Sequence, residues 1–291
     1  MNFTKASELL ELCNKHNKKI FEIMIERESF LTDMSKEDII AKMQISLDIM
    51  KDSIEKGLTE DIKSMGGLIG GDAKKVMERS KTSRSVCGTL MSRAISRSMA
   101  VLEVNASMGK IVAAPTAGAS GILPGVIITI GEEFKIEDRE LVNGLITAST
   151  IGMLISKNAT VAGAEGGCQA ETGSAAAMAA AAVVELMDGT PKMALDAAAI
   201  CIKNILGLVC DPIAGLVEVP CESRNAIGAA NALISAEMAL SGVKSIIPFD
   251  EVIDTMYKVG SSLPMELRET ALGGLAMTPT GKKLQKQIFD N

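Results

Sequence analysis

The chain contains few of the residues on which many familiar functional sites depend. Among its 291 residues there are one histidine, one tyrosine, six phenylalanines and no tryptophan. A His-Glu-x-x-His zinc motif is therefore absent, and a Ser-His-Asp triad is possible only if His16 takes part in it. Because His16 falls on the apolar stripe of a helix expected over residues 5–27, we interpret it as a packed or interface histidine.

The sequence also lacks a basic excess and a long apolar run. Its 30 Lys and Arg residues face 36 Asp and Glu residues, which gives a net charge of −6, whereas a nucleic-acid-binding domain carries a basic patch. The longest uninterrupted apolar run, residues 175–184, is about half as long as a membrane span. The first residues show no signal-peptide core. We therefore expect a cytoplasmic protein that binds neither nucleic acid nor a membrane.

With so few aromatic residues, aliphatic side chains must build the core. Hydrophobic residues make up 47% of the sequence, and helical periodicity recurs along most of it, so we predict an all-α, mostly helical fold. The expected helices cover residues 5–27, 36–56, 85–108, 122–134, 137–157, 168–187, 192–206, 222–240 and 250–259. A flexible glycine loop is expected at residues 64–72, and a polar tail from residue 278. No linker divides the chain, so we expect one domain, residues 1–291, with an N-terminal helical arm over residues 1–60.

The most distinctive stretch is an almost pure alanine helix that follows a glycine-rich turn. It begins with Glu165-Gly166-Gly167-Cys168-Gln169-Ala170-Glu171-Thr172-Gly173-Ser174 and continues through residues 175–184. Such a helix is apolar on every side, so we predict that it lies at the centre of the fold. Cys168 stands at its N-terminus, where the helix dipole favours the thiolate, the form of cysteine that binds metal.

The six cysteines fall into two groups. A disulfide framework is not expected in a long cytosolic chain, which leaves buried thiols or metal ligands. Three lie inside expected helices, where a core thiol is the usual role: Cys13, Cys87 and Cys201. Cys168 and Cys221 each begin a helix after glycine or proline, and Cys210 lies in the irregular segment between these helices.

The spacing of Cys168, Cys210 and Cys221 matches no compact zinc or ferredoxin motif, so the residues alone leave metal binding and simple packing both open. No histidine is near in sequence to complete a structural zinc site. Three thiolates suit an iron–sulfur cluster with one iron left open. An open iron is a Lewis acid that helps a hydroxyl group to leave as water.

A loop of small residues, directly before the helix expected at residues 122–134, is a candidate anion site. Unpaired N–H groups at a helix N-terminus bind anions, although a tight turn that merely needs glycine would have the same composition. The candidate residues are Thr116, Ala117, Gly118, Ala119 and Ser120.

Five segments, in order, resemble the iron–sulfur-dependent L-serine dehydratases, and most closely the α subunit of the two-subunit bacterial form. These segments are residues 113–119, 164–169, 207–215, 219–221 and 224–226. The resemblance covers about residues 65–281, which would form the catalytic core behind the N-terminal arm. It implies that Cys168, Cys210 and Cys221 hold a [4Fe–4S] cluster whose open iron takes the hydroxyl group of L-serine. The implied enzyme is a lyase, an L-serine ammonia-lyase that yields pyruvate and ammonia.

The resemblance also implies positive partners for the substrate carboxylate. The backbone of residues 116–121 is one candidate, and Arg224 with Asn225 is another. Lys110 and Glu165 are candidates for the general base by position only. In single-chain relatives a Ser-His-Thr segment lies in a region that this chain lacks and that resembles a separate β subunit. We therefore expect a β-subunit partner that can supply the base.

Three other functions stay open. L-cysteine desulfidation would use the same cluster, with sulfide as the leaving group. A pyridoxal-phosphate dehydratase would need a Schiff-base lysine in an α/β fold, and no strand-rich pattern surrounds any lysine here. A non-catalytic helical subunit would bury its cysteines without binding iron.

Overall fold

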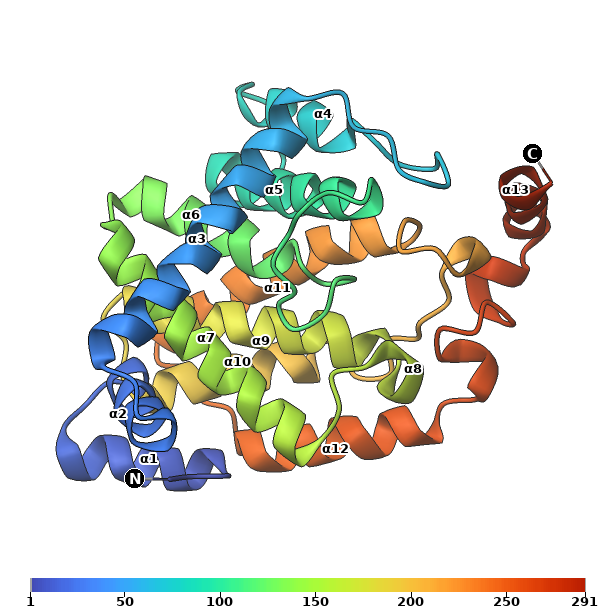
Figure 1. Ribbon diagram of the computed structural model, residues 1–291. Helices are drawn as coiled ribbons and strands as arrows, with labels where there is room; N and C mark the ends of the chain where they lie inside the picture. Colours follow the sequence, from blue (N-terminus) through green and yellow to red (C-terminus); the bar gives the residue numbers. More distant parts are fainter. Residues whose placement is uncertain (1, 291) are drawn as a thin grey trace.

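Helices make up the regular structure of residues 2–290, the part of the chain that the computed structural model describes (Figure 1). Within this part there are 13 α-helices, three short 3-10 helices and no strand, which confirms the predicted all-α fold. The elements are α1 (Ala6–His16), α2 (Ile20–Thr32), α3 (Lys36–Thr59), α4 (Asp72–Ser80), α5 (Gly88–Ala106), α6 (Ile122–Phe134), α7 (Asp138–Asn158), α8 (Gly163–Gly166), α9 (Cys168–Leu186), α10 (Pro191–Lys203), η1 (Ile213–Gly215), α11 (Cys221–Leu240), α12 (Phe249–Ser262), η2 (Met265–Leu267), η3 (Gly274–Met277) and α13 (Pro279–Phe289). In this part of the chain, no helix combines the length and the apolar character that crossing a membrane requires.

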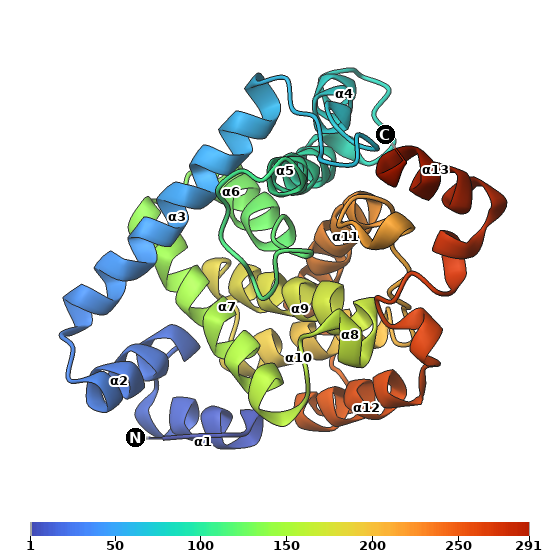
Figure 2. The same cartoon turned by 45° about the vertical axis from the view of Figure 1, so that its right-hand side comes forward.

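Helix α9 occupies the centre of the molecule, as predicted for the alanine-rich stretch. It packs against α6, α7, α10 and α11, and Figures 1 and 2 show these helices around it. Every residue from Cys168 to Glu185 is buried except Glu171. Alanine side chains are short, so the neighbouring helices approach the backbone of α9 closely. At Glu171, therefore, the surface of α9 is not fully covered by neighbouring helices.

Two helices, not one, occupy residues 5–27. Asn17 adopts the left-handed conformation, with φ 49°, and ends α1, and a second helix begins at Ile20. Asparagine tolerates this conformation better than most residues. The predicted single helix is therefore wrong. The apolar stripe of the sequence continues across the break at Asn17, because each of the two helices buries part of it. Cys13 is buried in α1, and Ile20 is buried in α2. His16 ends α1 and is exposed, so it does not pack within this chain.

Helix α4 was not predicted, and the glycine loop before it is held in place rather than flexible. Glu103 of α5 is completely buried and accepts hydrogen bonds of 2.7–2.9 Å from the N–H groups of Gly71, Asp72 and Ala73, so it caps α4. The carboxylate of Glu218 accepts three more hydrogen bonds from residues 64–68. Both carboxylates come from distant segments, so no local pattern indicates them.

Helix α13 and the start of α5 also differ from the prediction. The polar tail folds into α13, whose first turn is marked by the capping Thr278 and by Pro279. This signal is visible in the sequence. Helix α5 begins after Cys87, which is exposed and is not the core thiol that we expected. The other two expected core thiols, Cys13 and Cys201, are buried.

The N-terminal arm shares its core with the rest of the chain. Buried residues of its helices, such as Leu9, Ile23 and Leu47, belong to the same hydrophobic cluster as the alanines of α9. Helix α2 packs on α7, and α3 crosses both α5 and α7 (Figure 2). The arm is therefore packed into the structure that surrounds α9.

Candidate metal centre

Three segments that are far apart in the sequence meet at the N-terminal end of α9. Cys168 is the first residue of α9, and Cys221 is the first residue of α11. These two helices pack side by side, with α8 next to the start of α9 on the right of Figure 1. Cys210 lies in the irregular segment between α10 and α11, as the sequence predicted. Cys168 and Cys210 are buried, and Cys221 is half-buried.

Hydrogen bonds tie the segment of Cys210 to both helices. The N–H of Gln169, in the first turn of α9, donates to the carbonyl of Leu208 at 3.0 Å. The guanidinium of Arg224, in the first turn of α11, donates to the carbonyl of Val209 at 2.7 Å. The backbone directly before Cys210 therefore has a fixed place between the two helix ends.

The three thiols interact with one another electrostatically. Burial raises the pKa of Cys210, and the nearby Cys168 and Cys221 raise it further. Burial likewise raises the pKa of Cys221 to about 12, again with a contribution from Cys168. The pKa of Cys168 is also raised, mainly by burial, although Arg224 and Thr172 oppose the rise. The lowering of this pKa that the helix dipole predicts is therefore wrong for the metal-free thiol, since burial outweighs the dipole.

The spread of the three sulfur atoms limits which metal they suit. Among residues 2–290, the one group of three candidate ligands whose donor atoms all lie within 4.8 Å of one another consists of Asp72, Glu103 and Glu222. The three cysteines are more widely spaced than that. A single zinc ion with Zn–S bonds of about 2.3 Å would hold its sulfur ligands only about 3.8 Å apart. At least one pair of the cysteine sulfurs is therefore farther apart than it would be around a single zinc ion.

Glu171 lies beside Cys210, although no sequence motif marked it as a candidate. Its carboxylate accepts a hydrogen bond from the Thr116 hydroxyl at 2.8 Å and lies 4.0 Å from Cys210 Sγ. Burial raises the pKa of this carboxyl to about 7, and the charge of Glu269 adds to the rise. A single charged residue near the start of an otherwise apolar helix was the available signal.

A glycine leaves room for this carboxylate. A Cβ atom on Gly163 of α8 would lie 2.6 Å from Glu171 Oε2 and 3.2 Å from Cys210 Sγ. The bare backbone of α8 therefore approaches both groups. Glu171 lies between the small-residue loop on one side and a cysteine on the other.

Asn225 joins the small-residue loop to α11. Its side chain is completely buried, and its amide nitrogen donates to the carbonyls of Gly118 at 2.7 Å and Cys221 at 2.9 Å. Its amide oxygen accepts from the N–H of Gly121 at 3.1 Å. Ser120 is buried as well, and its hydroxyl has no hydrogen-bond partner among the described residues. The structure thus places the loop beside the start of α11, where Cys221 lies.

The remaining predicted residues relate to the site in different ways. Arg224 binds the carbonyl of Val209 and the carboxylate of Asp211, at 2.7 Å each, and its charge acts on Cys168. Lys110 is exposed in the segment after α5, and Glu165 is exposed on α8. No hydrogen bond or ion pair of the described residues links either of them to the three cysteines.

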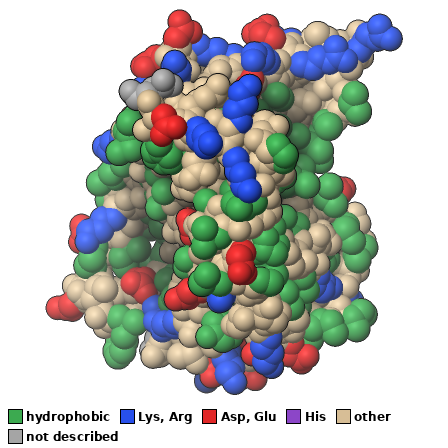
Figure 3. Space-filling view, turned by 90° about the vertical axis from the view of Figure 1, so that its right-hand side faces the viewer, with side chains coloured by type: hydrophobic (Ala, Val, Ile, Leu, Met, Phe, Trp, Pro, Cys, Tyr) green, Lys and Arg blue, Asp and Glu red, His purple; other side chains and the backbone are tan. Residues whose placement is uncertain are grey.

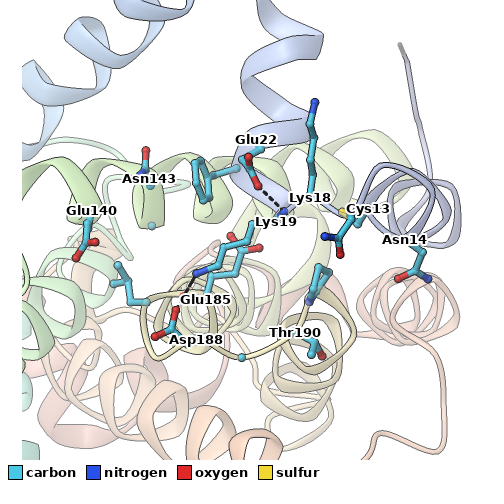
Figure 4. A pocket seen from close by; sticks show the side chains of 16 residues that line it. Cys13, Asn14, Lys18, Lys19, Glu22, Glu140, Asn143, Glu185, Asp188 and Thr190 are labelled. Carbon is cyan, nitrogen blue, oxygen red and sulfur yellow. Dashed lines mark hydrogen bonds and ion pairs between the residues drawn. The ribbon is translucent and has the colours of Figure 1, made fainter.

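A large cavity lies at the opposite end of α9. It has a volume of about 770 Å³ and is lined by residues of α1, α2, α7 and the C-terminal end of α9. Figure 4 shows Lys19 paired with Asp188 there, at 3.0 Å, with Glu185 beside them. The carboxylate of Glu185 accepts a hydrogen bond from the N–H of Ile20 at 2.5 Å. Lys19, Asp188 and Glu185 thus already have partners, and none of the three candidate metal ligands, Cys168, Cys210 and Cys221, lines this cavity.

Comparison with known proteins places the chain in a family. A family described as "Serine dehydratase alpha chain" matches residues 15–276. The chain is 48% identical over 287 residues to the "Probable L-serine dehydratase, alpha chain" of Bacillus subtilis (strain 168), covering 99% of this chain and 95% of that protein. It is also 48% identical over 284 residues to the "L-serine dehydratase, alpha chain" of Peptoniphilus asaccharolyticus, covering 98% and 97% of the two chains.

A longer relative is matched in part. The chain is 36% identical over 283 residues to an L-serine dehydratase of Escherichia coli (strain K12), which covers 95% of this chain and 62% of that protein. The chain belongs to the serine dehydratase alpha-chain family.

Proposed function

We propose that the chain is the catalytic α subunit of an iron–sulfur-dependent L-serine dehydratase, which converts L-serine to pyruvate and ammonia. The names of its relatives support this activity. The observation that carries the proposal is that Cys168, Cys210 and Cys221 come from three distant segments and lie close enough to affect one another's pKa. In this proposal the three cysteines hold a [4Fe–4S] cluster.

The donor set fits such a cluster. Thiolates are the usual ligands of iron–sulfur clusters, and the three sulfur atoms are not arranged as tightly as the ligands of a single zinc ion. Burial and mutual repulsion oppose ionisation of the free thiols, and a bound cation would offset both effects. When bound, a cluster with one iron free of protein ligands supplies a Lewis acid toward the substrate hydroxyl group.

The chain's own residues bind and orient the substrate in this proposal. The N–H groups of residues 116–120 and the guanidinium of Arg224 face the substrate carboxylate. Asn225 is completely buried, so its part is to hold the loop in position. The carboxylate of Glu171, which lies between Thr116 and Cys210, accepts a hydrogen bond from the substrate ammonium group.

The general base comes from a separate β subunit in this proposal. The chain has one histidine, and this residue is exposed on α1, outside the segments that form the site. The chain also spans only 62% of the longer Escherichia coli relative, so part of that protein has no counterpart here. We propose that this part corresponds to the partner and that both subunits work together in the cytoplasm.

Exposed apolar side chains near the site support a protein partner. Met65 lies in the loop that Glu218 holds close to Cys221, and its exposed fraction is 71%. Hydrophobic side chains are also visible across the middle of the face that is turned forward in Figure 3, which is the right-hand side of Figure 1. Exposed apolar patches on a protein surface commonly mark an interaction site.

Anaerobic purification of the full chain, with and without a β subunit, tests the proposal. Iron and acid-labile sulfide are measured on the wild type and on Cys168→Ala, Cys210→Ala and Cys221→Ala, with Cys201→Ala as the control for loss of a buried thiol. We expect each site substitution to lose the cluster and Cys201→Ala to keep it. An iron-free wild type, or iron content that none of the three substitutions changes, contradicts the cluster.

The assembled enzyme then separates serine dehydration from cysteine desulfidation. Pyruvate is measured with L-serine and with L-cysteine as substrates under the same conditions. We expect kcat/KM to be higher for L-serine, and a higher value for L-cysteine would assign the site to desulfidation.

A further inference from the structure

Asp211, the residue after Cys210, binds two other parts of the site. Its exposed fraction is 3%. One carboxylate oxygen accepts a hydrogen bond from Arg224 Nη2 at 2.7 Å, and the other accepts one from the N–H of Leu275 at 2.7 Å. A Cβ atom on Gly274 would overlap the carboxylate, so the backbone at this position must be bare. Asp211 therefore joins the irregular segment to α11 and to the C-terminal segment around η3.

Arg224, the partner of Asp211, also connects this residue to the segments of Cys221 and Cys168. Arg224 lies one helical turn after Cys221 in α11, and its guanidinium also binds the carbonyl of Val209 on the other side of Cys210. Its positive charge acts on Cys168 as well. The Asp211–Arg224 pair thus touches or adjoins all three cysteine-bearing segments.

We propose that Asp211 and Arg224 form a buried clamp that fixes the three cysteines relative to one another, with Asp211 as a positioning residue for the metal centre. The inference rests on the proposed function, in which these cysteines hold a cluster. A buried ion pair gives little net stability, but removal of one partner leaves an uncompensated buried charge, which moves to find another partner or water. Residues that hold metal ligands in place typically change metal affinity by about 10–100-fold when replaced.

The clamp predicts faster loss of iron when Asp211 is disturbed. The full chain is purified anaerobically and exposed to a ferrous chelator, and iron release is followed with time. Asp211→Asn keeps the size of the side chain but removes its charge. Gly274→Ala keeps the charges of Asp211 and Arg224, but its added methyl group displaces the Asp211 carboxylate. We expect each variant to release iron at least about tenfold faster than the wild type.

Gly242→Ala is the matched control. Gly242 also has a positive φ, +89°, but a Cβ atom there meets nothing within 4 Å, so the substitution strains the backbone without touching the site. We expect this variant to release iron at the wild-type rate. Circular dichroism establishes that each variant is folded. If Asp211→Asn does not fold, the rate of iron release from Gly274→Ala alone tests the clamp.

The outcomes separate the clamp from the proposed function. Wild-type release rates in both Asp211→Asn and Gly274→Ala overturn the clamp. A raised KM for L-serine in Asp211→Asn, with iron release unchanged, also overturns it and assigns Arg224 to the substrate alone. Absence of iron from the wild type is a failure of the proposed function, and it is seen before any variant is compared.

Discussion

The carboxylate of Glu171 faces the candidate site from a helix that is otherwise buried from Cys168 to Glu185. It accepts a hydrogen bond from the hydroxyl of Thr116 and lies 4.0 Å from the thiol of Cys210. A negative group at this point, opposite the N–H-rich loop, suits a substrate that carries both an ammonium and a carboxylate group.

Glu171→Gln is expected to weaken substrate binding without affecting the cluster. The amide keeps the size of the side chain and can still accept a hydrogen bond from Thr116, but it loses the charge that attracts the ammonium group. Charged hydrogen bonds contribute about 1.5–3 kcal/mol, so KM for L-serine should rise by about tenfold or more. Steady-state kinetics of the assembled enzyme measure it, together with iron content.

Glu165→Gln is the control for this prediction, because Glu165 is exposed on neighbouring α8. We expect its KM to equal that of the wild type. An unchanged KM in Glu171→Gln would remove Glu171 from the substrate site, and lost iron would assign it to the metal centre instead.

Single residues were predictable where a local pattern marks them. Glycine or proline before a helix set Cys168 and Cys221 apart from the core thiols, and the structure brings both to one place. Glu171 and Asp211 carried no such mark, because their partners, Thr116 and Leu275, are distant in the sequence. The pKa of Cys168 was predicted in the wrong direction because burial is a tertiary property.

Helices α3 and α5 cross at a contact that only glycine permits. A Cβ atom on Gly57 of α3 would overlap the backbone oxygen of Ala100 in α5. Because both atoms belong to helix backbones, neither can move without shifting a whole helix. This crossing holds the end of the N-terminal arm against the part of α5 that also caps α4.

Gly57→Ala is therefore expected to destabilise the chain. Overpacking at such a contact costs about 1–3 kcal/mol, and the better helix propensity of alanine returns up to about 1 kcal/mol of this. Urea denaturation of the iron-free chain should show a loss of about 1–2 kcal/mol in the free energy of unfolding. Ile45→Ala, in the same helix at a side chain that is 59% exposed, should stay within about 0.5 kcal/mol of the wild type. Equal losses of unfolding free energy in Gly57→Ala and Ile45→Ala would contradict a close crossing of α3 and α5 at Gly57.

Helices with local signals were the most predictable elements. Helix α6 runs over the predicted residues 122–134, and α9 ends close to Asp188 and Gly189 as expected. Helix α4 escaped prediction because its cap, Glu103, belongs to another helix. The break at Asn17 escaped because two short helices that bury the same side have the periodicity of one long helix.

At the scale of the whole molecule, Glu185 connects the N-terminal arm to the core. Its carboxylate accepts hydrogen bonds from the N–H of Ile20 in α2 and from the hydroxyl of Thr147 in α7. Burial raises the pKa of this carboxyl above its ordinary value, although these hydrogen bonds oppose the rise. The folded chain therefore holds the proton of Glu185 more tightly than the unfolded chain does.

The stability of the chain should accordingly depend on pH through Glu185. Below the ordinary pKa of 4.5 the group is protonated in both states. As pH rises from there through the raised pKa of the folded chain, the contribution of this group to stability is lost, by at most about 1.4 kcal/mol per pH unit. The Glu185→Gln variant has no titratable group at position 185. The unfolding free energy of the wild type minus that of the variant should therefore fall with rising pH in urea denaturation, and a rising or constant difference contradicts this account.

The central position of α9 was predictable because its composition leaves no polar side to face water. Which helices surround it was not, because the order of packing depends on contacts between segments, such as those of α3 with α5 and of α2 with α7. The folding of the N-terminal arm into the common core was hidden for the same reason.

The alanines of α9 restrict how this protein can diverge. From Ala175 to Ala182 every side chain except Met178 ends at Cβ and has an exposed fraction of 0%. Any larger side chain there must displace a neighbouring helix, and loss of the methyl group would introduce a glycine into a helix interior. We therefore expect substitutions to accumulate in the outer helices, whereas the helix that carries Cys168 at one end and Glu185 at the other has little freedom to change.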